Sequence, residues 1–136
     1  MTQPEDYPLH ILSGMYGVAR LSPEADLPPW AREGELWAAV RTRGELSIVC
    51  EERYIPPEVR AERGWMALQV EGPLDFSLVG VLASLSAVLS DAGVSIYSLS
   101  TYDTDYLLIK ESTKERALAA LHGAGYLVLA PLEPGG

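Results

Sequence analysis

The sequence predicts an α+β protein whose C-terminal half is a ferredoxin-like unit of order β-α-β-β-α-β. Short apolar runs typical of strands lie at residues 65–70, 94–101, 106–110 and 126–132. Apolar residues with helical spacing separate the first two runs, and again the last two. In this arrangement an antiparallel sheet carries both helices on one face.

The first predicted helix follows a turn-forming stretch. From Phe76 the apolar residues recur with helical spacing, and Gly93 is suited to end the helix in a left-handed conformation. Asp75 is a good N-cap, so we expect the helix to begin beside it. Gly80 then falls inside the helix, where it costs about 1 kcal/mol relative to alanine. Its presence indicates close packing, here against the sheet.

The second predicted helix begins at a capping box formed by Ser112 and Glu115. Its apolar face lies within residues 117–124, and the glycines of 123–125 end it. A last strand, Tyr126–Leu132, completes the unit.

The N-terminal half has strand signals but little helix. Strand candidates lie at residues 9–12, 16–21, 36–42 and 46–52, and Pro28–Arg32 is long enough for one helical turn. Arg43 and Gly44 predict a two-residue turn in which the glycine supplies a positive φ. So little helix cannot cover both faces of a sheet, and we expect this half to pack on the C-terminal half.

These patterns divide the chain into four parts. We expect a smaller β unit at residues 1–55 and a ferredoxin-like unit at 65–132. A connector at 56–64 separates them, because consecutive prolines cannot continue a sheet. Residues 133–136 are expected to form a flexible tail.

Composition excludes several classes of function. The chain has 136 residues, enough to bury a core without disulfides or a metal, and it has a single cysteine, Cys50. A net charge of −9 with scattered basic residues argues against binding to nucleic acid. We find no apolar run of about 18 residues that could span a membrane and no signal peptide, so we expect a cytoplasmic protein.

Signals of catalysis are weak. His10 and His122 stand alone, without metal-ligand spacing to Cys50, which lies in an apolar strand run and is expected in the core. The sequence has no phosphate-binding loop and no nucleophile elbow. We therefore expect no enzyme activity and no cofactor.

The stretch Ser98–Tyr106, SLSTYDTDY, places two aspartates and several hydroxyls between two apolar strands. A tight turn explains Asp103, because aspartate bonds to its own backbone in turns. Asp105 opens the next strand, where aspartate is depleted, so a contact with a small polar ligand is an alternative reading for it. The stretch is a turn in either case.

Together, GPLDFSLVG and STYDTDYLLIK resemble the ACT domain, a βαββαβ regulatory module that usually binds amino acids. Residues 65–132 are most similar to small bacterial tandem-ACT proteins, which are related to the ACT halves of aspartate kinases and to cytosolic arginine sensors. ELSIVCEE, at residues 45–52, resembles part of a first ACT unit. Because that half lacks a full first helix, the resemblance implies a degenerate ACT-like unit there.

The resemblance also implies a site where the loop after the first ACT strand meets the strand-end motif. Asp105 would contact a basic group of the ligand, and the start of the helix has free N–H groups suited to a carboxylate. The residues implied by this comparison are Gly72, Leu74, Asp75, Phe76, Ser100, Thr101, Tyr102, Asp103, Thr104 and Asp105.

The predicted function is that of a non-catalytic regulatory module. It would bind a free amino acid, basic ones included, and work as a homodimer, with no nucleic acid or membrane partner. The alternative is a ligand-free module for homo-oligomerisation or protein interaction. The effect of Asp105→Ala on ligand stabilisation separates the two.

Overall fold

The computed structural model describes residues 3–74 and 80–131. The chain divides into two compact units, one built from residues 14–65 and the other from the first 13 residues together with those from 66 onward. Strand β5 (Ala61–Val70) contributes its first half to one unit and its second half to the other.

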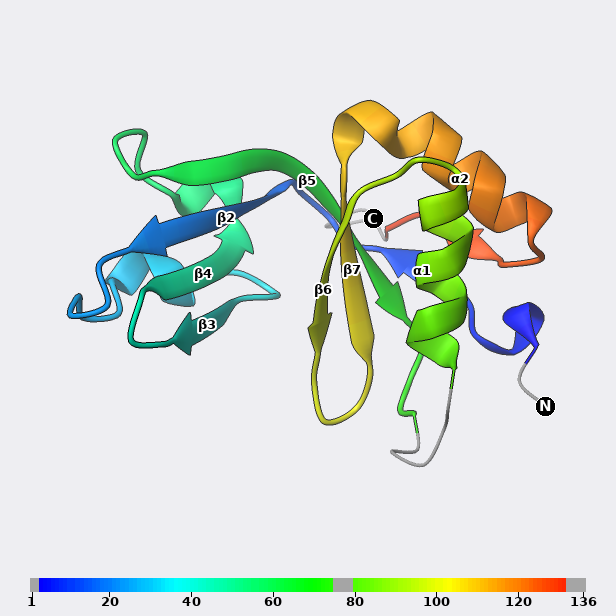
Figure 1. Ribbon diagram of the computed structural model, residues 1–136, viewed down its shortest axis with the longest axis horizontal. Coiled ribbons are helices and arrows are strands. Elements are labelled where there is room, and N and C mark those ends of the chain that lie inside the picture. Colours follow the sequence, from blue (N-terminus) through cyan, green and yellow to red (C-terminus); the bar gives the residue numbers. More distant parts are fainter. Residues whose placement is uncertain (1–2, 75–79, 132–136) are drawn as a thin grey trace. The chain divides into compact units, whose positions relative to one another are not determined.

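The larger unit contains the predicted β-α-β-β-α-β order, which is confirmed (Figure 1). Its sheet has the order β6-β7-β5-β1-β8. The elements are β1 (Leu9–Ile11), the second half of β5, α1 (Val81–Asp91), β6 (Ile96–Ser100), β7 (Asp105–Lys110), α2 (Lys114–Gly123) and β8 (Val128–Leu129). β1 is antiparallel to β5 and parallel to β8, so the sheet is mixed where an antiparallel one was expected.

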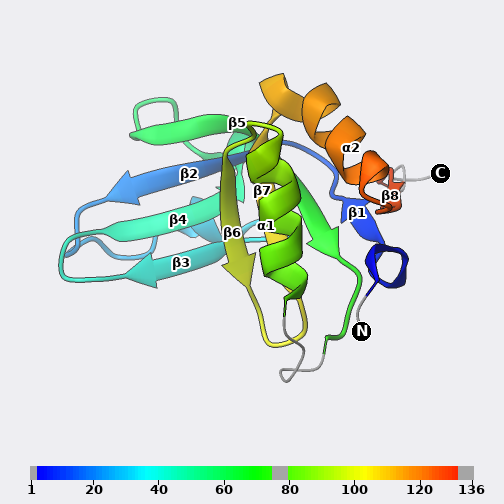
Figure 2. The same cartoon turned by 45° about the vertical axis from the view of Figure 1, so that its right-hand side comes forward.

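The two helices of this unit lie side by side (Figure 2). Leu85 and Leu89 of α1 and Leu121 of α2 are fully buried, as are residues 107–109 of the sheet. Gly93 follows α1 with a φ of 75°, as predicted. The Gly93 and Val94 amides donate to the Ser90 and Leu89 carbonyls, so the last turn keeps its bonds as in a Schellman motif.

The start of each helix differs from the prediction. α1 begins at Val81, and Gly80 precedes it with a φ of 92°, a left-handed conformation that lies outside a helix. The expected cap Asp75 lies outside the described residues. The capping box of Ser112 and Glu115 is wrong, because a 3-10 turn at 111–113 precedes α2 and the Thr113 hydroxyl donates to the Lys110 carbonyl at 2.8 Å.

The smaller unit is an antiparallel sheet of order β3-β4-β2-β5. Its own strands are β2 (Tyr16–Leu21), β3 (Ala38–Arg41) and β4 (Leu46–Glu51). The predicted helical turn is present as a 3-10 helix at Pro29–Arg32. β5 begins at Ala61, so residues 61–64 of the expected connector are strand.

The turn between β3 and β4 is closed by a side chain. The Thr42 hydroxyl accepts hydrogen bonds from the amides of Gly44 and Glu45, at 3.1 and 3.2 Å. Gly44 is not among the glycines of positive φ, so the predicted left-handed glycine is wrong. Because the Thr42 hydroxyl satisfies two amides of the turn, the turn does not need a glycine in the left-handed conformation.

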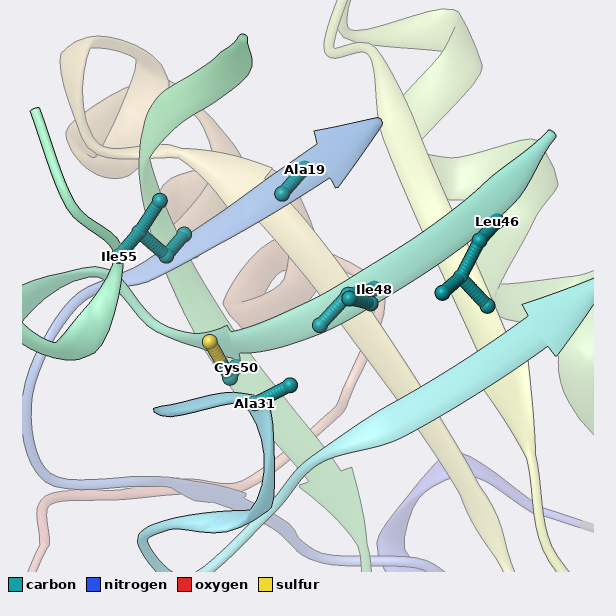
Figure 3. Packing of buried hydrophobic residues seen from close by; sticks show 6 residues of the cluster. All are labelled: Ala19, Ala31, Leu46, Ile48, Cys50 and Ile55. Carbon is teal, nitrogen blue, oxygen red and sulfur yellow. The ribbon is translucent and has the colours of Figure 1, made fainter. Parts of the chain in front are cut away.

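The core of the smaller unit is shown in Figure 3. Alternate residues of β4 point the same way, because successive side chains of a strand face opposite sides. They pack with a residue of β2, one of the 3-10 helix, and one that follows a second 3-10 turn at Glu52–Tyr54; the cluster comprises Ala19, Ala31, Leu46, Ile48, Cys50 and Ile55. Cys50 is therefore a core residue, as expected.

Glu51 is the acidic exception at the end of this core. It is only 8% exposed and lies beside two glycines of positive φ, Gly14 and Gly34. A Cβ on Gly34 would lie 2.1 Å from the Glu51 Oε2 atom. The Arg53 Nε atom lies 3.3 Å from Oε1, so the carboxylate has a cation beside it.

Gly34→Ala is expected to lower the free energy of unfolding by at least about 2 kcal/mol, because the left-handed φ of 91° alone costs about 1–2 kcal/mol and the methyl group also meets Glu51. Urea unfolding measures this. Gly64→Ala has a positive φ but open space, so it should cost less, and Gly44→Ala should stay within about 0.5 kcal/mol. Equal costs for Gly34 and Gly64 would contradict the role of Glu51.

Burial, and then the negative charge of Glu51, raise the pKa of the Cys50 thiol to about 11 from 9.0. The folded protein therefore holds this proton at pH values where the unfolded chain releases it, and stability falls as the pH rises from 9 to 11. Cys50→Ala should flatten this part of the pH profile of urea unfolding. Identical slopes in the two proteins would contradict it.

Candidate functional site

A hollow of about 320 Å³ lies in the larger unit, between the start of α1 and the turn that joins β6 to β7. This volume is at the lower end of the range for small-molecule sites. The lining residues are Leu74, Gly80, Val81, Leu82, Ala83, Ser100, Thr101, Tyr102, Asp103, Thr104 and Asp105. We refer to this hollow as the turn pocket.

The β6–β7 turn forms one wall of the turn pocket. The Thr101 amide donates to the Thr104 carbonyl at 2.8 Å, and the Thr101 hydroxyl accepts from the Thr104 amide at 3.2 Å. The Thr101 side chain thus closes the turn, where the sequence favoured Asp103. Asp103 and Tyr102 are exposed at the tip, Tyr102 by 79%.

Asp105 is the first residue of β7 and pairs with Ser100, the last residue of β6. The Ser100 hydroxyl donates to the Asp105 Oδ1 atom at 2.6 Å. This charge-assisted bond explains how an aspartate can open the strand. It leaves further acceptor positions on the carboxylate, which accommodates about four hydrogen bonds in all.

The chain after β5 comes close to the same turn. The Leu74 amide donates to the Asp103 carbonyl at 2.6 Å. The hydroxyl of buried Thr104 donates to the Val70 carbonyl at the end of β5, also at 2.6 Å. These contacts hold together two segments that are about thirty residues apart in the sequence.

The opposite wall is the first turn of α1; from the sequence, the start of this helix was expected in the site but was placed beside Asp75, so residues 80–83 were not named. The first intrahelical bond runs from the Ser84 amide to the Gly80 carbonyl, so the amides of residues 81–83 precede the helical ladder. In the described part of the chain, no side chain caps this helix and its first turn holds no acidic residue. Because the helix start was predicted at Phe76, residues 81–83 were expected inside the helix. Gly80, just before the β-branched Val81, was the sequence signal that could have marked the true start.

The turn pocket gathers most of the residues implied by the sequence comparison. Leu74 and residues 100–105 line it. Gly72 lies next to it, since a Cβ there would be 3.0 Å from the Thr104 Cβ atom. Asp75 and Phe76 lie outside the described residues.

Other candidate residues are placed elsewhere. The His10 Nε2 atom lies 2.9 Å from the Glu71 Oε1 atom on a partly exposed surface. His122 lines a second hollow of about 350 Å³, otherwise apolar, beside α2. Within residues 3–74 and 80–131, no group of His, Cys, Asp and Glu could hold a metal ion. No helix in the described ranges is long and apolar enough to cross a bilayer.

Residues 60–123 match the family model of the ACT domain, and residues 14–58 match a model that describes an N-terminal domain. No curated protein sequence was found to match. The fold resembles the crystal structure of an Agobacterium tumefaciens protein, with 36% identity, a TM-score of 0.89, and 98% of this chain and 97% of that one covered.

Two more distant structures share the fold. A Vibrio cholerae protein has a TM-score of 0.70 at 18% identity, covering 86% of this chain and 88% of its own. The regulatory subunit of aspartate kinase from Thermus thermophilus has a TM-score of 0.57 at 14% identity, covering 86% of this chain and 96% of its own.

Thr101→Ala is expected to lower the free energy of unfolding by about 0.5–1.5 kcal/mol, because the hydroxyl that closes the β6–β7 turn is lost. Asp103→Ala, at an exposed position two residues further on, should change stability by less than about 0.5 kcal/mol. Urea unfolding without added ligand measures both. A larger cost for Asp103 than for Thr101 would restore the assignment made from the sequence.

Proposed function

Residues 60–123 match the ACT-domain model, and on this premise we propose that the chain is a regulatory module of the ACT-domain family that binds a free amino acid in the turn pocket. The Thermus thermophilus structure with the same fold is a regulatory subunit of aspartate kinase, which supports a regulatory role in place of a catalytic one.

The observation that carries the proposal is the polarity of the turn pocket. One wall is the first turn of α1, where the amides that precede the helical ladder and the positive end of the helix dipole favour a carboxylate. The other wall includes Asp103 and Asp105, and carboxylates favour an ammonium or a guanidinium group. A free amino acid presents a carboxylate and an ammonium on one small molecule.

Charge further favours a ligand with a basic side chain. The lining of the turn pocket contains two acidic side chains and no basic one among the described residues. Residues 1–13 together with 66–136 hold ten acidic side chains and three basic ones. The resulting negative potential raises the local concentration of cations. Arginine and lysine are therefore the first amino acids to test.

We infer that the protein forms a homodimer in the cytoplasm. Regulation would follow if binding of the amino acid changes the equilibrium between monomer and dimer. A ligand shifts such an equilibrium only by its difference in affinity for the two states. Comparing the molar mass of the purified protein with and without amino acids therefore tests this part of the proposal directly.

A ligand-free association module is the second candidate. Strand β3 stands at the end of the strand order, and Val40 within it and Trp37 before it are 54% and 39% exposed. An edge strand with exposed apolar side chains can pair with another chain. This function predicts self-association that is independent of any amino acid.

The test is thermal unfolding of the purified protein with each common amino acid at millimolar concentration. A ligand at 100 times its Kd adds about 2.7 kcal/mol, which is about ten degrees of Tm for a chain of this size. Asp105→Asn removes the charge but keeps an oxygen that can accept from Ser100. We expect this variant to lose most of the shift.

Asp91→Asn is the matched control. It removes one exposed carboxylate at the far end of α1, about 15 Å along the helix from its first turn. This variant should keep the full shift. An absence of any shift in the wild-type protein, or an equal loss in both variants, would count against the turn pocket and favour the association module.

A further inference from the structure

We propose that Thr104 is the positioning residue of the turn pocket. Its hydroxyl fastens the β6–β7 turn to the end of β5, and it thereby holds Asp103 and Asp105 opposite the first turn of α1. The inference rests on the proposed amino-acid site and adds to it the residue that sets its geometry.

The burial of Thr104 sets it apart within the turn. Residues 101–103 are exposed, whereas Thr104 is only 5% exposed. Aromatic residues and Cys50 aside, the buried polar or charged side chains in the described ranges are those of Thr104 and Glu51. A hydroxyl at such a position is retained when it satisfies another buried polar group.

The group that Thr104 satisfies is the carbonyl of Val70, the last residue of β5. The Thr104 Oγ1 atom donates to this oxygen at 2.6 Å, and Val70 is itself fully buried. A buried carbonyl that loses its partner keeps the cost of desolvation. Moving the turn away from β5 would break this bond at the end of the strand.

A second contact restrains the same two segments. The Leu74 amide donates to the Asp103 carbonyl at 2.6 Å. Gly72 permits this approach, because a Cβ there would lie 3.0 Å from the Thr104 Cβ atom and 3.1 Å from the Asp103 carbonyl oxygen. The chain after β5 and the turn thus meet at a place where an added methyl group would crowd both.

Thr104 therefore acts through its neighbours. Its hydroxyl donates to the Val70 carbonyl, while Asp103 and Asp105 on either side of it line the turn pocket. Loss of the Thr104 hydrogen bond would not remove either carboxylate. It would make the position of the β6–β7 turn, which contains or borders both aspartates, less fixed.

The experiment compares Thr104→Val, which has nearly the same shape without a donor, with Thr104→Ser, which keeps the hydroxyl. Hydrogen exchange of the Leu74 amide is measured without ligand, and the Kd values of L-arginine and L-lysine are measured by calorimetry. In Thr104→Val we expect exchange about tenfold faster and binding about tenfold weaker, the equivalent of one lost hydrogen bond. Thr104→Ser should restore both to within about twofold.

Two further variants separate positioning from general stability. Gly72→Ala crowds the same contact from the other side and should weaken binding in the same direction. Gly34→Ala destabilises the other unit and should leave both Kd values unchanged. Wild-type affinity in Thr104→Val, or failure of Thr104→Ser to restore it, would overturn the inference.

If the wild-type protein binds neither probe, the proposed cationic ligand fails and the role of Thr104 in binding fails with it. Exchange of the Leu74 amide in the ligand-free variants is then still decisive for the contact itself. Unchanged exchange in Thr104→Val would show that its hydroxyl does not hold the two segments together.

Discussion

The structure depends most on the pairing of strand β5. Its first half pairs with β2, its second half pairs with β1, and β7 also pairs with it. Ala67, Leu68 and Val70 are fully buried as a result. A strand fixed in this way gives the chain that follows it a defined starting point, and the turn pocket is built from that chain.

The position of the turn follows from this constraint. β6 and β7 are in register from Ile96↔Ile109 to Ser100↔Asp105, so the turn falls at residues 101–104. Because β7 is also a neighbour of β5, the turn ends next to the last residue of β5. Two segments distant in the sequence therefore meet through backbone geometry, and the Thr104 hydroxyl joins them.

The turn pocket combines an electropositive wall and an acidic wall with few charged residues. The positive end is provided by the backbone at the start of α1, and the negative end by side chains at a strand terminus. Among the described residues that line it, two are aspartates and none is an arginine or a lysine. The net negative charge of the chain does not identify a partner by itself, but the structure shows that two of its aspartates line the turn pocket.

Local patterns along the sequence were sufficient for the order of the elements. The strands, the two helices and the glycine that ends α1 follow from apolar spacing and from the freedom of glycine to adopt positive φ, both of which act over a few residues. The resemblance of GPLDFSLVG and STYDTDYLLIK to ACT domains indicated the family.

Tertiary structure decided what those patterns leave open. The start of α1 at Val81, the insertion of β1 between β5 and β8, and the burial of Glu51 each depend on contacts between segments far apart in the chain. Ser112 matched a capping pattern, but a 3-10 turn occupies residues 111–113 and the Thr113 hydroxyl donates back to the Lys110 carbonyl, a local bond that competes with capping. The spatial meeting of Leu74, Thr104 and Asp105 is likewise a property of strand pairing, since no spacing along the chain encodes which strand ends become neighbours.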